Sequence, residues 1–63
     1  MRVRMNNVIF LVMRVESLDD KIILYTFPDG KSLTLYVSNE EERDSILQGL
    51  YLEGFLDIKS EWL

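Results

Sequence analysis

The side chains that could take part in a reaction here are carboxylates, hydroxyls and amines, because the chain contains no histidine and no cysteine. The sequence therefore has no imidazole base, no thiolate nucleophile and no catalytic triad. The carboxylates lie in turns, at Asp19, Asp20 and Asp29, or follow one another from Glu40 to Asp44 without the spacing of a calcium loop. The residue types predict a protein that is not an enzyme and holds no metal and no cofactor.

The small size of the chain points to self-association. With 63 residues it forms one domain, residues 1–63, of which 48% are hydrophobic and 29% charged, too apolar for a disordered protein. A domain of this length buries only roughly 60% of the surface that its unfolded chain exposes. Small domains are usually supplemented by disulfides, a zinc site or oligomerisation, and the first two need cysteine or histidine. We therefore expect a homodimer.

Six consecutive apolar residues, from Val8 to Met13, predict the central strand of a small sheet. This strand is expected to cover residues 2–16, with a bend or bulge possible near Asn6-Asn7. The run is too short to cross a bilayer and ends at Arg14-Val15-Glu16 without the small-residue cleavage site of a signal peptide. A cytoplasmic protein with no membrane partner is expected.

A second strand is predicted at residues 21–27, and Pro28-Asp29-Gly30 is typical of a tight hairpin turn into a third strand. If Phe27 faces Lys31 across this turn, Tyr25 pairs with Leu33, and Ile23 with Leu35. Period-two alternation then places the odd-numbered residues of all three strands on the inner face of the sheet.

A helix should follow the third strand. Its capping box is either Ser38 with Glu41 or Asn39 with Glu42, and Gly54 suits its left-handed end. The expected core stripe is Ile46, Leu47, Leu50 and Tyr51. Residues 56–63 alternate again and predict a short last strand beside the first. The expected fold is α+β: a small antiparallel sheet in the order β-β-β-α-β, with one helix packed on one face and the other face used for dimerisation.

The even-numbered face is the predicted dimer interface. One helix cannot cover both sides of a sheet, and an apolar patch of a few hundred Å² rarely stays exposed. A two-fold dimer is the commonest way to cover such a patch, although sheet curvature or a foreign partner would also do so. The patch consists of Val8, Phe10, Val12, Ile22, Leu24 and Tyr36.

A second protein is the expected foreign partner. The formal net charge of −4 disfavours nucleic acid, although Arg2, Arg4 and Arg14 share the even face with aromatic residues. The expected partner-binding residues are the acidic helix start, the outward leucine of the helix and the aromatic residue near the end of the chain, namely Glu40, Glu41, Asp44, Leu52 and Trp62. Trp62 would alternatively close the core or a dimer seam.

These observations predict a small acidic binding module, a homodimeric inhibitor or regulator of another protein. By analogy alone, size and acidity are those of small proteins with which phages and mobile elements disable host proteins. One alternative is a protein that binds or sequesters a nucleotide-like small molecule in a pocket at the dimer seam, lined by Tyr36 and the arginines. Another is a structural subunit that adds its edge strand to a larger assembly.

Overall fold

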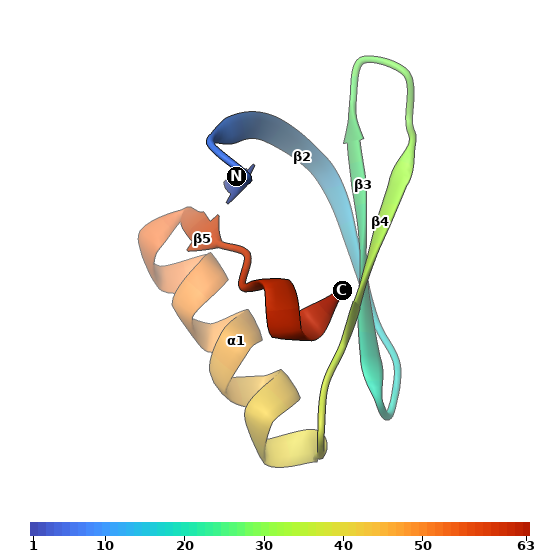
Figure 1. Cartoon of the computed structure of the whole chain (residues 1–63), viewed down its shortest axis with the longest axis vertical. Coiled ribbons are helices and arrows are strands. Elements are labelled where there is room, and N and C mark those ends of the chain that lie inside the picture. Colours follow the sequence, from blue (N-terminus) through green and yellow to red (C-terminus); the bar gives the residue numbers. More distant parts are fainter.

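A five-stranded sheet with one α-helix forms the computed structural model, which describes residues 1–63 (Figure 1). The strands lie in the order β4-β3-β2-β1-β5, and every neighbouring pair is antiparallel except β1 and β5, which are parallel. The α+β fold is confirmed, with one strand more than expected and a mixed sheet. The elements are β1 (Arg2–Met5), β2 (Val8–Ser17), β3 (Lys21–Phe27), β4 (Ser32–Tyr36), α1 (Glu40–Glu53), β5 (Phe55–Asp57) and a 3₁₀ turn, η1 (Ser60–Trp62).

The predicted first strand is in fact a hairpin. Asn6 and Asn7 have φ values of 51° and 66°, left-handed conformations that asparagine tolerates better than most residues. They form a two-residue turn between β1 and β2, the connection that matches the twist of a hairpin. Because the turn reverses the alternation, Val3 pairs with Phe10, and both lie on the same face of the sheet.

A register shift between Val12 and Arg14 reverses the alternation of β2 again, so that Val15 pairs with Leu24. The inner face is therefore shared by the odd positions of β1, the even positions of β2 before the shift, and Val15 after it. The prediction that odd-numbered residues face inward throughout is wrong for the central strand, since Val12 is buried while Ile9 and Leu11 are exposed.

The β3–β4 turn is confirmed at Pro28-Asp29-Gly30, with Gly30 at φ 72°, but the predicted register is off by one residue. Across the turn the amide and the hydroxyl of Thr26, and not Phe27, donate hydrogen bonds to the Lys31 carbonyl. In consequence Leu24 pairs with Leu33, and Ile22 with Leu35. This register brings four aliphatic side chains to one face, which the predicted register would have divided between both faces.

The helix follows its local signals. Asn39 is the N-cap and accepts a hydrogen bond from the amide of Glu42 at 2.8 Å, so the cap forms in the second of the two expected registers. The reciprocal bond of a full capping box is displaced by one residue, because the Glu42 carboxylate accepts from the Ser38 amide and not from that of Asn39. Gly54 ends α1 in the left-handed conformation at φ 67°. Of the expected stripe, Ile46 and Leu50 are buried and Leu47 packs beside them, whereas Tyr51 is exposed.

The end of the chain closes the molecule. The last strand is shorter than predicted but lies beside β1 as expected, because the Arg2 amide donates to Gly54 and the Ile58 amide to Arg4. Trp62, in η1, is buried with 7% of its surface exposed. The core lies between the sheet and α1 and contains Val3, Val12, Ile22, Leu24, Leu35, Ile46, Leu50, Ile58 and Trp62.

The α-helix is too short and too polar to cross a membrane, and no other helix of the chain has the length and apolar character to do so.

Candidate protein-interaction surface

The side of the sheet that faces away from the core, here called the outer face, carries an exposed apolar cluster. Leu11 pairs with Arg2 on one side and with Phe27 on the other, so these three side chains share the outer face. Ile9 lies two residues before Leu11 on the same strand, and Met13 lies at the register shift. The exposed fractions are 55% for Ile9, 52% for Leu11, 61% for Met13 and 57% for Phe27.

Arginines border this apolar cluster. Arg4, next to Ile9 on β1, forms an ion pair with Asp57 of β5 at 2.6 Å and lies 5.8 Å from the ring centre of Phe55. The hydrogen bond from Arg4 holds the pKa of Asp57 below its ordinary 3.8 and raises the pKa of Arg4. Arg2, between Leu11 and Phe55 in the sheet, forms no ion pair within the chain.

Arg14, the third arginine at this border, is held by contacts within the chain. Arg14 forms an ion pair with Glu16 at 3.0 Å, and its guanidinium lies 4.4 Å from the ring centre of Tyr25. The Tyr25 hydroxyl in turn donates to the same carboxylate at 3.4 Å. This local network satisfies the charge of Arg14 within the chain and covers the tyrosine ring with a cation.

The predicted dimer patch is not a surface. Ile22 and Leu24 are fully buried beneath the helix side of the sheet, Val12 is buried beside them and Phe10 is half-buried against the core, while Val8 and Tyr36 are exposed. The prediction failed because the Asn6-Asn7 turn and the register of the β3–β4 hairpin turned these residues toward α1. The apolar residues that sequence reasoning missed are those of the outer face, and reading Asn6-Asn7 as a two-residue turn would have found them.

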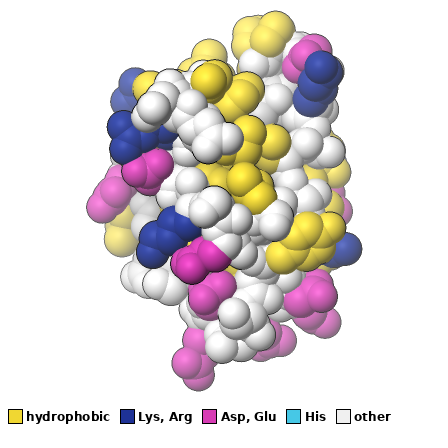
Figure 2. Space-filling view, in the orientation of Figure 1, with side chains coloured by type: hydrophobic (Ala, Val, Ile, Leu, Met, Phe, Trp, Pro, Cys, Tyr) yellow, Lys and Arg dark blue, Asp and Glu magenta, His cyan; other side chains and the backbone are white.

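The predicted partner-binding residues do not form one site. Glu40, Glu41 and Asp44 are exposed at the start of α1, whereas Leu52, 77% exposed, lies near its other end. In Figure 2, acidic side chains gather at the end of the molecule where α1 begins, and apolar side chains gather across its middle. Trp62 belongs to the core, which is the position expected for it if it does not bind a partner.

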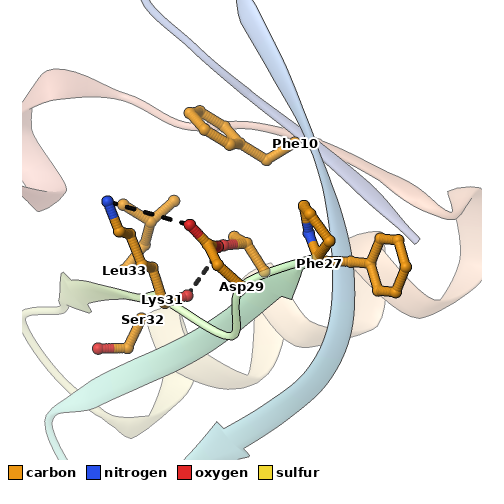
Figure 3. A pocket seen from close by; sticks show the side chains of 8 residues that line it. Phe10, Phe27, Asp29, Lys31, Ser32 and Leu33 are labelled. Carbon is orange, nitrogen blue, oxygen red and sulfur yellow. Dashed lines mark hydrogen bonds and ion pairs between the residues drawn. The ribbon is translucent and has the colours of Figure 1, made fainter.

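A pocket of about 330 Å³ lies at the turn end of the β3–β4 hairpin (Figure 3). Phe10 and Leu33 form part of its apolar lining, and the Lys31 ammonium lies 3.9 Å from the Asp29 carboxylate beside them. Within one chain, Tyr36, on β4, and Arg4, on β1, are separated by two intervening strands, and a pocket at a seam between two chains stays a prediction.

Comparisons with protein-family models, with curated proteins and with solved structures found no match to this chain.

Proposed function

We propose that this chain is a non-enzymatic protein-binding module that inhibits or regulates another protein by occupying part of its surface. The observation that carries the proposal is the apolar cluster of Ile9, Leu11, Met13 and Phe27, each more than half exposed on a face that the chain's own helix does not cover. Contiguous apolar surface with a polar border is characteristic of protein contact sites.

The charges around the cluster define the partner. Arg2 has no carboxylate partner in the chain, whereas Arg4 and Arg14 at the same border are already paired with Asp57 and Glu16. Opposite charges at the edge of an interface guide association and reject wrong partners. The partner that fits is a protein surface with an apolar centre and a carboxylate placed to meet Arg2.

The same contacts support a protein in preference to a nucleic acid. Arg4 and Arg14 are already paired with Asp57 and Glu16, so phosphates would have to displace those carboxylates. Base stacking on Tyr25 would require Arg14 to leave its ring. The acidic helix adds repulsion toward a long polyanion.

A selection of displayed peptides on the immobilised protein tests this proposal. Binders are expected to be rich in apolar and acidic residues, and their affinity should fall about tenfold or more with Leu11→Asp, as for a central contact residue. Leu52→Asp is the matched control, because Leu52 is an exposed leucine away from the sheet. Circular dichroism verifies that both variants are folded.

Binders that tolerate Leu11→Asp but lose affinity with Leu52→Asp would contradict the proposal and place the contact on α1. Binders whose affinity is changed by neither substitution would also contradict the proposal.

A further inference from the structure

The edge strand β4 has a free side. It is the outermost strand of the sheet and pairs only with β3. Thr26 and Lys31 bond across the hairpin, and the Val37 amide donates to Asp20 at the other end of the strand. Since inward and outward backbone groups alternate along an antiparallel strand, the amides and carbonyls of Ser32, Thr34 and Tyr36 point away from β3.

This edge lacks the features with which proteins usually prevent strand pairing. Its sequence, Ser32-Leu33-Thr34-Leu35-Tyr36, contains no charge and no proline. Its pairing with β3 has no register shift, so no bulge interrupts the strand. Natural sheets protect their free edges with lysine, proline, bulges or very short strands. An uninterrupted, uncharged edge is therefore competent to accept another strand.

The strand is also close to symmetric about its middle residue. Leu33 and Leu35 flank Thr34, and Ser32 and Tyr36, both polar, flank the leucines. In an antiparallel pair of two such strands centred on Thr34, threonine would face threonine, each leucine a leucine, and each serine a tyrosine. Threonine–threonine and aliphatic pairs of this kind are favourable between neighbouring strands. A strand that complements itself favours a second copy as its partner.

The charges at the two ends of β4 support the same arrangement. Lys31, exposed and immediately before β4, is positive, whereas Glu40 and Glu41, at the helix start that follows β4, are negative and exposed. Antiparallel pairing brings the beginning of one strand to the end of the other. The lysine of each copy would thus lie toward the acidic helix start of the other.

We propose that β4 pairs antiparallel with β4 of a second copy, about a two-fold axis that passes between the two Thr34 residues, to form one continuous sheet across a dimer. The backbone groups of Ser32, Thr34 and Tyr36 would be satisfied across the axis. Because this axis is perpendicular to the sheet, the outer faces of both copies would lie on the same side and the helices on the other. The inference is independent of the proposed function, which uses the outer face and not the edge.

Two oppositely charged variants test the pairing. Thr34→Lys and Thr34→Glu each place like charges opposite one another at the axis and should each give the mass of a single chain, 7.5 kDa, by light scattering. The wild type should give twice that mass at the same concentration. An equimolar mixture of the two variants should recover the dimer, because a lysine then faces a glutamate.

A backbone substitution at Thr34 distinguishes loss of the dimer from loss of the fold. Thr34→Pro deletes an outward amide and leaves the hydrogen bonds to β3 intact, as proline does on edge strands. It should be monomeric while the emission of Trp62 still reports a buried side chain. Thr34→Val, which keeps the amide, should remain dimeric.

Leu11→Asp separates this inference from the proposed function, since it should leave the dimer intact while it lowers the affinity for selected peptides about tenfold or more. A wild-type chain that is monomeric at every concentration would overturn the pairing. So would a dimer that tolerates Thr34→Pro but dissociates with Leu11→Asp, which would place the contact between outer faces.

Discussion

Asp57 and Arg4 show what one exposed ion pair does at the seam between the two ends of the chain. Their ion pair, with 2.6 Å between the two charged atoms, joins β5 to β1, two strands that are far apart in sequence. The hydrogen bond from Arg4 lowers the pKa of Asp57 from 3.8 in the folded protein, whereas the unfolded chain keeps an ordinary value near 3.9. The ionised carboxylate therefore stabilises the fold above the unfolded pKa, and this contribution disappears as the pH falls through the folded pKa.

We expect Asp57→Asn to be less stable than the wild type at pH 7 and equally stable below the folded pKa of Asp57. Urea unfolding at pH 7 and at successively lower pH measures how the difference disappears. The effect should be small and should shrink in high salt, because both side chains are exposed. Glu61→Gln, which removes a carboxylate that forms no ion pair, is the control and should show no such pH dependence. A difference that persists unchanged at low pH would contradict the role of the ion pair.

Among the elements, the helix shows where local sequence suffices. Asn39 caps it through its side chain, whereas the Ser38 side chain makes no hydrogen bond and only the Ser38 amide donates one, to the Glu42 carboxylate. We expect Asn39→Ala to lower the free energy of unfolding by about 0.5–2 kcal/mol, the usual cost of a lost cap. Ser38→Ala should cost much less, as measured by urea unfolding. Equal losses in the two variants would mean that the capping box shifts to its other register.

The strands show where local sequence does not suffice. Helix ends were predictable because Asn39 and Gly54 act on their own neighbours. The face that each strand residue occupies depends instead on the number of residues in each turn. A single extra residue, as at the β3–β4 turn or at the bulge near Met13, exchanges the two faces of everything that follows. For this reason the strands, the hairpin and the order of elements were largely predictable, while the inner and outer residues, and with them the candidate surface, were not.

On the scale of the whole molecule, Trp62 anchors the end of the chain in the core. A tryptophan truncated to alanine in a core costs about 3–5 kcal/mol, whereas a chain of this length has a total stability of only about 3–9 kcal/mol. We expect Trp62→Ala to be largely unfolded by circular dichroism, and Trp62→Phe to stay folded with reduced stability. Leu63→Ala is the control, because Leu63 is exposed and should tolerate truncation. A fully folded Trp62→Ala would show that η1 is dispensable.

The parallel pair of β1 and β5 also makes completion of the sheet depend on two segments that are far apart in sequence. Between β1 and its partner Phe55–Asp57 lie the other three strands and the helix. Until β5 docks, the folding chain carries an open strand edge beside β1, the kind of edge that other chains can join. The protein is therefore most exposed to misassembly in the stage of folding before β5 has docked.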